Sequence, residues 1–261
     1  MVAIYGFART ADDLADEGNA SPAQRLHDLA DFRRDLDAVA AQQAPSSRWA
    51  PVFSALGTQL SARHLPLPLL HDLLSAFEQD MLKNRYADRA ELLDYCRRSA
   101  NPVGRLLLHL YGVNDAVSLA QSDAICSALQ LINFWQDLSV DTSRGRLYAP
   151  LRDCEKHGVS EAQILARTDN AASQTLVADM LTWARGLMLQ GAPLVHAVPG
   201  RAGWELRLVV QGGLRIAEKI KNMNHASLVT RPKLNALDVP LMLWRAWRMT
   251  PKKLGMAKKA P

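Results

Sequence analysis

Aspartate residues gather in two short segments that stand far apart in the chain. The first is Asp12-Asp13-Leu14-Ala15-Asp16, and the second runs from Asn133 to Asp141. Both contain aspartates four residues apart, which lie one turn from each other on the same face of a helix. Apolar residues surround both segments, and a carboxylate among apolar residues is costly unless a cation meets it. Both segments are therefore candidates for binding a cation.

Two such helices turned toward each other would present a cage of oxygen ligands. Oxygen ligands of this kind suit Mg²⁺ together with its waters and a substrate phosphate. In the second segment Asn133, Asp137 and Asp141 form a polar stripe at i, i+4 and i+8, and Arg144 and Arg146 follow it. Acceptors followed by cations and bounded by aromatic residues are typical of a site that binds a metal ion and a diphosphate. Taken alone, either aspartate pair also fits a solvated helix face or a helix-capping run.

Composition places the chain among ordinary globular proteins. Its 261 residues, 48% hydrophobic and 22% charged, are enough for one large domain or two small ones. No uninterrupted apolar run is long enough to predict a helix across a membrane, and the first residues do not fit a signal peptide. The three cysteines are scattered, which indicates reduced thiols in the cytoplasm rather than disulfides or a zinc site.

Basic residues gather at the C-terminus of a chain whose net charge is +5. Four lysines (Lys252, Lys253, Lys258 and Lys259) follow Trp244 and Trp247. This end could be solvated, or it could make a peripheral contact with anionic lipid on the inner face of a membrane. No nucleic-acid-binding motif accompanies the charge, so we expect no nucleic-acid partner.

The hydrophobic pattern is helical nearly throughout. Apolar residues recur at intervals of three and four, as from Leu26 to Val39 and from Leu69 to Met81, and no alternating β-type run appears. Breaks are predicted where Pro, Gly and Asn gather, near residues 44–47, 66–68, 101–102, 111–114 and 198–200. We expect Asp169 or Asn170 to cap a helix. With no linker or repeat, the sequence predicts a single all-α domain.

Asn101 and Pro102 interrupt a helical pattern in the middle of the chain. A proline there frees a backbone carbonyl and kinks or restarts the helix. The small residues Ala100 and Gly104 would let a ligand approach the backbone closely. The same residues also fit a plain kink with a capping asparagine.

Three motifs together make the chain resemble the squalene/phytoene synthase family, and within it the hydroxysqualene synthases of bacterial hopanoid pathways. The motifs are YGFARTADDLADE at residues 5–17, YCRRSANPVG at residues 95–104, and NFWQD at residues 133–137 continuing to Asp141 and to GRLYAP at residues 145–150. The Asn-Pro of the middle motif favours this branch, because squalene and phytoene synthases usually carry Ala-Gly there. The resemblance extends over essentially the whole chain, residues 1–261.

The resemblance implies a terpenoid-synthase helical bundle around a central apolar cavity. Its catalytic residues would be Asp12, Asp13, Asp16, Tyr95, Asn101, Asp137 and Asp141. Mg²⁺ would be the cofactor, with Asp12, Asp16, Asn133, Asp137 and Asp141 as ligands. The substrate diphosphate would be bound by Arg9, Asn133, Gln136, Arg146 and Tyr148.

The reaction implied for this branch converts presqualene diphosphate and water into hydroxysqualene and diphosphate. We hypothesise that Asn101 positions the water that captures the carbocation. The alternative reaction is head-to-head coupling of two farnesyl diphosphates into presqualene diphosphate, or into a product of the squalene or phytoene type. Other enzymes of the squalene pathway are possible partners in either case.

One departure from the family pattern lies at the N-terminus. Relatives generally carry a further helix before the first acidic motif, whereas here that motif begins by residue 12. The expectation is therefore a domain that lacks the family's first helix. A shortened bundle suggests a third hypothesis, a non-catalytic homologue that acts as a partner subunit or lipid-binding scaffold. The intact acidic motifs argue against this third hypothesis. Burying carboxylates costs desolvation free energy, and a protein without catalytic activity would not need to retain them.

Overall fold

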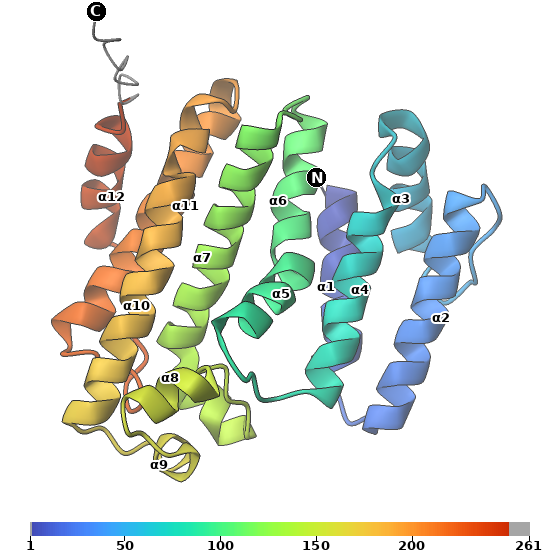
Figure 1. Cartoon of the computed structure of the whole chain (residues 1–261). Coiled ribbons are helices and arrows are strands. Elements are labelled where there is room, and N and C mark those ends of the chain that lie inside the picture. Colours follow the sequence, from blue (N-terminus) through green and yellow to red (C-terminus); the bar gives the residue numbers. More distant parts are fainter. Residues whose placement is uncertain (1, 251–261) are drawn as a thin grey trace, which may run out of the picture.

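The computed structural model describes residues 2–250, and those residues form helices and loops without a strand (Figure 1). The predicted all-α, single-domain fold is confirmed. The helices are α1 (Val2–Asp16), α2 (Pro22–Ala40), α3 (Ala50–Arg63), α4 (Leu67–Leu82), α5 (Arg89–Ser99), α6 (Asn101–Leu110), α7 (Ala116–Asp141), α8 (Leu151–Lys156), α9 (Glu161–Leu165), α10 (Ala171–Gly191), α11 (Gly200–Asn222) and α12 (Asp238–Trp247), with 3-10 helices η1 (Thr142–Arg144) and η2 (Ala192–His196).

Helix boundaries follow the local signals in the sequence. α5 ends at Ser99 and α6 begins at Asn101, with Pro102 in its first turn, where a proline costs no hydrogen bond. Asn170 caps α10: its side chain accepts from the Ser173 backbone N–H while the Ser173 hydroxyl accepts from the Asn170 N–H. The predicted interruptions near residues 44–47, 66–68, 111–114 and 198–200 all fall in loops or at helix ends.

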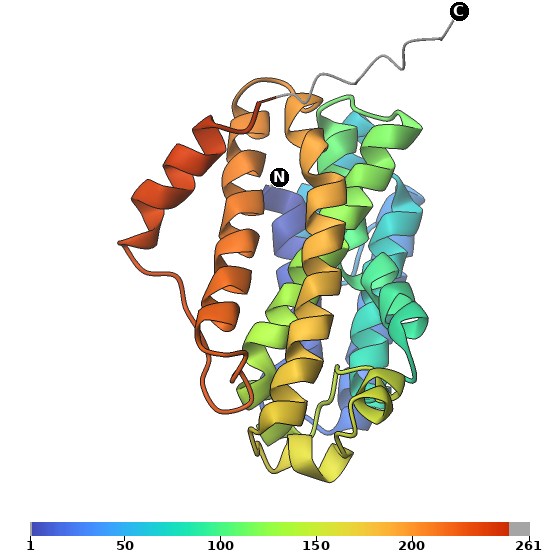
Figure 2. The ribbon, with the colours of Figure 1, turned by 60° about the vertical axis from the view of Figure 1, so that its left-hand side comes forward.

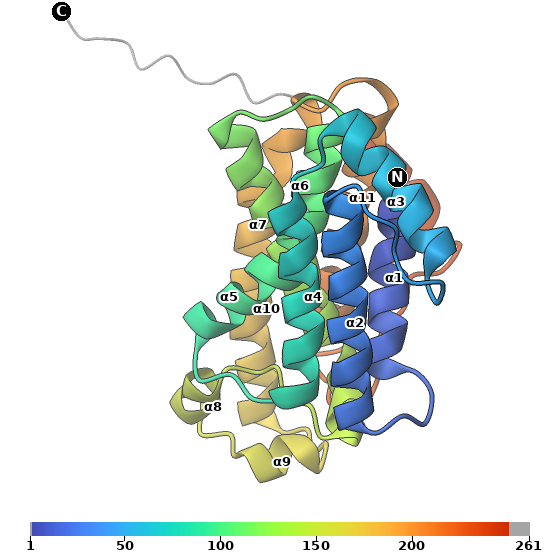
Figure 3. The same ribbon diagram turned by 90° about the vertical axis from the view of Figure 1, so that its right-hand side faces the viewer.

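Helices α1 to α4 pack together at one end of the molecule (Figure 1 and Figure 3). Their buried faces meet around an aromatic cluster in which Phe32 lies between Phe7, Trp49 and Phe53, with ring centroids 5.2, 5.2 and 4.6 Å away. All four rings are almost completely buried. This packing fixes the orientation of α1, since Phe7 lies on the same helix as the first acidic segment.

Helices α5 to α11 share a second apolar cluster, in which α7 packs along α10. Tyr86, Tyr95, Phe134 and Tyr148 form an aromatic wall within it, and the rings of Phe134 and Tyr148 stack at 3.8 Å. The second acidic segment therefore lies at the end of a helix whose apolar face is buried against this wall.

Helix α12 stands at the edge of the bundle beside α11 (Figure 2). The buried carboxylate of Asp238 pairs with Arg215 and Lys219 of α11, so these charges join the two helices. Trp244 and Trp247 point outward and are 52% and 71% exposed. The four lysines for which a lipid contact is predicted lie outside the described residues, and that contact stays a prediction. Within residues 2–250 no helix has the length and apolar character needed to cross a bilayer.

Candidate active site

The first acidic segment forms the C-terminal end of α1. Arg9, one turn earlier, pairs with Asp12 at 3.1 Å, Asp13 at 2.7 Å and Glu17 at 2.6 Å. These side chains are roughly half exposed, so the ion pairs lie at a surface and not in the core. The row of carboxylates therefore already holds one cation, the Arg9 guanidinium that the sequence predicts as a diphosphate ligand.

The second acidic segment ends α7, and a tight turn follows it. Asp141 is the last residue of the helix, and its backbone carbonyl accepts a hydrogen bond from the Arg146 N–H at 3.0 Å. Gly145 closes the turn with φ of 72°, a left-handed conformation that glycine adopts without a steric penalty. The turn places Arg144 and Arg146 beside the helix end.

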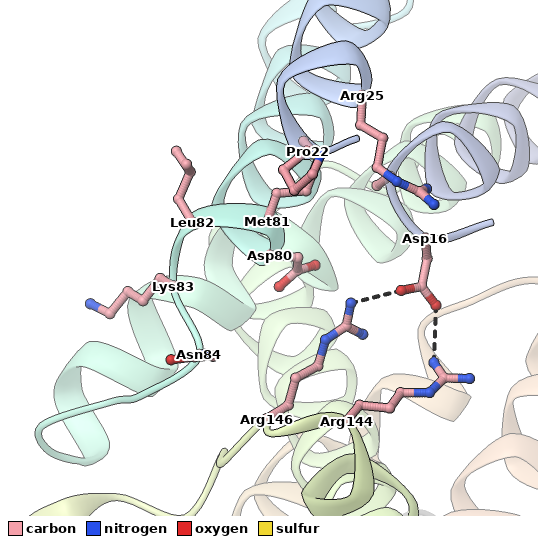
Figure 4. Close-up of a pocket in the computed structure, with 11 residues that line it drawn as sticks. Asp16, Pro22, Arg25, Asp80, Met81, Leu82, Lys83, Asn84, Arg144 and Arg146 are labelled. Atoms are coloured by element: carbon pink, nitrogen blue, oxygen red, sulfur yellow. Dashed lines mark hydrogen bonds and ion pairs between the residues drawn. The ribbon is translucent and has the colours of Figure 1, made fainter. Parts of the chain in front are cut away.

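These two arginines join the two acidic segments. Asp16 of α1 accepts from Arg146 at 2.7 Å and from Arg144 at 3.1 Å (Figure 4). Residues that are far apart in sequence thus meet at one point, with the guanidinium groups between the end of α1 and the end of α7. An arrangement of carboxylates and arginines that face each other is one in which a phosphate group can exchange for a carboxylate.

A polar pocket of about 310 Å³ opens at this junction. Figure 4 shows Asp16, Asp80 and Arg146 facing the same space, whereas Leu82 and Lys83 point away from it. The complete lining consists of Ala15, Asp16, Pro22, Arg25, Asp80, Met81, Leu82, Lys83, Asn84, Arg144 and Arg146. Asp80 and Asn84 belong to neither acidic motif, and reasoning from spacing missed them both.

Burial and neighbouring charges shift the pKa values of the site's carboxylates in different directions. Burial, aided by the negative charge of Asp137, raises the pKa of Asp141 to about 6. Burial also raises the pKa of Asp12, against the influence of Arg9. At Asp16 burial acts in the same direction, but the hydrogen bonds and charges of Arg146 and Arg144 hold its pKa below the usual value. Among these three carboxyls, Asp16 is therefore the one that arginine side chains neutralise best.

The loop between α11 and α12, residues 223–237, crosses the second acidic segment. Both carboxylate oxygens of Asp137 accept from the Arg231 guanidinium, one of them at 3.0 Å. The Gln136 amide donates to the Pro232 carbonyl at 2.7 Å. The second row, like the first, therefore holds an arginine. No sequence pattern pointed to Arg231, because it comes from an irregular loop.

Tyr95 and Tyr148 line the inner side of the site. Tyr95 is only 3% exposed, and its hydroxyl donates to Asp80 Oδ2 at 2.8 Å. Burial raises the pKa of both tyrosines, so both stay protonated at neutral pH. The wall that they form with Phe134 gives the polar pocket an aromatic neighbour.

Asn101 and Asn133 occupy different surroundings. Asn101 is buried at the junction of α5 and α6, 3.0 Å from the Ser127 hydroxyl of α7, and its amide NH₂ can donate to the carbonyls of Cys96 and Asp123 at 3.3 and 3.2 Å. These contacts tie the kinked helix pair to α7. Asn133 is exposed on α7, one turn before Asp137. The water-positioning role of Asn101 and the ligand role of Asn133 both stay predictions.

The donor set suits a hard divalent cation that arrives with a diphosphate. The carboxylates of both rows are oxygen ligands, and each row forms an ion pair with an arginine. Among residues 2–250, no three His, Cys, Asp or Glu side chains gather closely enough to hold a metal unaided. Mg²⁺ commonly uses only one or two protein carboxylates, together with waters and substrate phosphates.

In this all-α bundle, Asp16 at the end of the first carboxylate row meets two arginines that follow the second row, at a polar pocket near an aromatic wall. Such a site is compatible with a metal ion and an anion. The family model for squalene/phytoene synthase matches residues 1–238. The chain therefore belongs to the squalene/phytoene synthase family, whose members act on isoprenoid diphosphates.

Individual relatives agree with this assignment. A hydroxysqualene synthase of Sinorhizobium fredii is 30% identical over 244 residues, covering 93% of this chain and 80% of the relative. One from Rhodopseudomonas palustris is 29% identical over 229 residues, covering 87% and 76%. Among solved structures, squalene synthase HpnC from Alicyclobacillus acidocaldarius superposes with a TM-score of 0.80 at 33% identity, covering 85% of this chain and 82% of that chain.

Proposed function

We propose that this protein is a Mg²⁺-dependent enzyme that converts presqualene diphosphate and water into hydroxysqualene and diphosphate. The observation that supports it most directly is the junction at Asp16, where Arg144 and Arg146, which follow the second carboxylate row, bind the end of the first row at a polar pocket that all three residues line. The similarity to proteins named hydroxysqualene synthase favours this reaction over other reactions of the family.

The carboxylates would hold the metal, and the arginines would hold the diphosphate. The expected ligands of Mg²⁺ are Asp12, Asp16, Asn133, Asp137 and Asp141, with Asp13 in the same row. When bound, Mg²⁺ neutralises the charge that develops on the departing diphosphate. Arg146 and Arg144 can exchange their carboxylate partner for phosphate oxygens, and Arg9 can do the same at the other wall.

The aromatic wall would serve the organic part of the substrate. The faces of Tyr95, Phe134 and Tyr148 carry negative potential, and such faces attract a cation that passes close to them. A carbocation next to the faces of these rings would be stabilised by their negative potential. The wall also limits the water that reaches the cation, so that a single positioned water can decide the product.

Incubation with two substrates tests the proposal directly. With Mg²⁺ present, we expect presqualene diphosphate to give hydroxysqualene and one equivalent of diphosphate, detected by chromatography of the organic extract and by a diphosphate assay. Addition of EDTA should abolish both products. Formation of presqualene diphosphate from farnesyl diphosphate, with no alcohol, would instead establish the coupling reaction. If neither substrate releases diphosphate, the non-catalytic alternative is correct.

Arg231 offers a test of the metal site that needs no turnover. Because Arg231 binds both oxygens of Asp137, it competes with a metal ion for this carboxylate. We expect Arg231→Gln to bind Mn²⁺, used as a probe for Mg²⁺, about fivefold more tightly, since a partly exposed ion pair is worth up to about 1 kcal/mol. Electron paramagnetic resonance of free Mn²⁺ measures the affinity without substrate.

A matched variant controls for general loss of positive charge. Arg245 also pairs with a carboxylate, Glu218, but it joins α12 to α11 and not to an acidic row. Arg245→Gln should leave Mn²⁺ affinity unchanged. Equal affinities for wild type and Arg231→Gln would show that Asp137 does not bind the metal.

A further inference from the structure

Asp80 is a carboxylate with one satisfied and one unsatisfied oxygen. It lies near the end of α4, outside both acidic rows. Its Oδ2 accepts the Tyr95 hydroxyl hydrogen at 2.8 Å, whereas its buried Oδ1 has no hydrogen-bond partner among the described residues. A buried polar oxygen left without a partner costs free energy, and such atoms are uncommon in folded proteins. The arrangement therefore calls for a physical reason.

The surroundings of Asp80 combine a pocket with an aromatic wall. On one side it lines the polar pocket with Arg146 and Asp16 (Figure 4). On the other side its partner Tyr95 packs among the rings of Tyr86 and Phe134. Asp80 and the Tyr95 hydroxyl thus form a short polar link from the wall, where an organic cation would lie, to the pocket where solvent and diphosphate would lie.

Several charged and titratable groups face Asp80. Burial is the largest influence and raises its pKa to about 6. The Tyr95 hydrogen bond and the Arg146 charge act in the opposite direction, whereas the carboxylates of Asp12 and Asp16 on α1 raise it further. A carboxyl with a pKa near 6 is ionised at neutral pH but accepts a proton more readily than a solvated aspartate does.

The proposed reaction must dispose of one proton. Loss of diphosphate breaks a carbon–oxygen bond and leaves a carbocation, and a water oxygen then forms a new bond to that carbon. The product is a protonated alcohol, which becomes hydroxysqualene only when an O–H bond breaks and a base takes the proton. No oxidant or reductant is involved. Neither acidic row supplies this base if its carboxylates are engaged with the metal.

We infer that Asp80, acting through the Tyr95 hydroxyl, accepts the proton that the captured water releases. In this relay the Tyr95 oxygen takes the proton of the nascent alcohol as its own hydrogen passes to Asp80 Oδ2, so Tyr95 ends neutral and Asp80 ends protonated. The proton then leaves through the pocket that Asp80 lines. Asp80 is a positioning and proton-accepting residue in this role, and Tyr95 is the group that touches the reacting atoms. The inference rests on the proposed function.

Asp80→Asn separates this role from a purely structural one. The amide oxygen can still accept the Tyr95 hydrogen bond, but the amide cannot take up a proton. We expect kcat to fall about 100-fold while KM changes less than about twofold, since general bases contribute on the order of 10² to 10⁴. Tyr95→Phe should lower kcat by a similar factor. The kcat of the double variant should be no lower than that of either single variant, because the two residues act as one unit.

The pH profile provides a second kinetic readout. Wild-type kcat should decline toward acidic pH as Asp80 becomes protonated, and this acidic limb should flatten in Asp80→Asn. The measurement needs saturating Mg²⁺, because burial also brings the pKa of Asp141 to about 6 and would otherwise add a limb through metal binding. The difference between the two profiles then reports Asp80 alone.

Melting temperature tests the charge state without substrate or metal. Because the pKa of Asp80 is raised on folding, the folded protein holds this proton more tightly than the unfolded chain. The contribution of Asp80 to the stability of wild type is therefore lost as pH rises from about 4 to about 6. Asp80→Asn should melt higher than wild type at pH 8 and at the same temperature near pH 4. Asp123→Asn, which breaks an ion pair with Arg105, should melt lower than wild type at pH 8.

The outcomes distinguish this inference from the proposed function. Full activity of Asp80→Asn, an unchanged acidic limb, or a lower melting temperature than wild type at pH 8 would each overturn the proton-accepting role. If wild type makes no alcohol but couples farnesyl diphosphate, the proposed function fails and the inference fails with it, because no water is captured. A protein that turns over neither substrate overturns both.

Discussion

Asp137→Asn is expected to slow diphosphate release on the order of 10³-fold at saturating substrate. The carboxylate of Asp137 is largely buried and now binds Arg231 with both oxygens, so it is the member of the second row best placed to exchange an arginine for a metal ion. An amide is a far weaker ligand for Mg²⁺ and leaves the cation less well neutralised. A continuous assay of released diphosphate measures the effect, with the Mn²⁺ affinity of the same protein as a second readout.

Asp123→Asn is the matched control for this loss. Asp123 lies on the same helix as Asp137 and likewise pairs with an arginine, Arg105, but it is far from the acidic rows along α7. Its substitution should lower stability modestly and leave diphosphate release within about twofold, as is usual for a surface pair. Comparable activity of Asp137→Asn and Asp123→Asn would exclude Asp137 from the metal site.

The fold is accessible from the sequence because its determinants are local. Helix ends coincide with chemical signals such as Pro102, whose ring restarts a helix, and Asn170, whose side chain caps one. The aspartate spacing likewise fixes which carboxylates share a face, since that follows from helix geometry alone. Distance between helices has no such local signal. The contact of Asp16 with Arg146 depends on how α1 and α7 pack, and a sequence motif alone does not specify it.

The spacing of the acidic motifs identified neither Asp80 nor Arg231 as a residue of the site, for two different reasons. Asp80 continues the apolar stripe of α4, at i+7 from Leu73 and i+3 from Phe77, so a carboxyl on a core-facing position was a detectable signal. Arg231 lies in the irregular segment between α11 and α12, where no periodic pattern indicates what a side chain faces. Conversely, Asn133 fits the polar stripe by spacing, yet it lies on an exposed part of α7. Periodicity identifies a face but not the neighbour that covers it.

Arginines balance the negative charge of the two carboxylate rows. The carboxylates within one row repel one another. Arg9 pairs with the first row and Arg231 pairs with the second, which reduces this repulsion. These pairs are mostly at the surface, so each is weak and can be exchanged at low cost. If the proposed metal and diphosphate replace these pairs, the exchange would not require the aromatic cluster that holds α1 in place to move.

Arg146→Gln is expected to reduce kcat/KM for the diphosphate substrate by about 10²- to 10³-fold, the range found when one donor to a developing anion is lost. Arg146 pairs with Asp16 at 2.7 Å and also lowers the pKa of Asp80 and Asp141, so its charge acts on both rows and on the pocket between them. Arg146→Lys should retain part of the activity, because an ammonium keeps the charge but not the planar fork. Arg152→Gln, which removes an exposed arginine from the next helix, should have almost no effect. Steady-state kinetics of diphosphate release compare the three, and equal losses for Arg146→Gln and Arg152→Gln would contradict a diphosphate-binding role for Arg146.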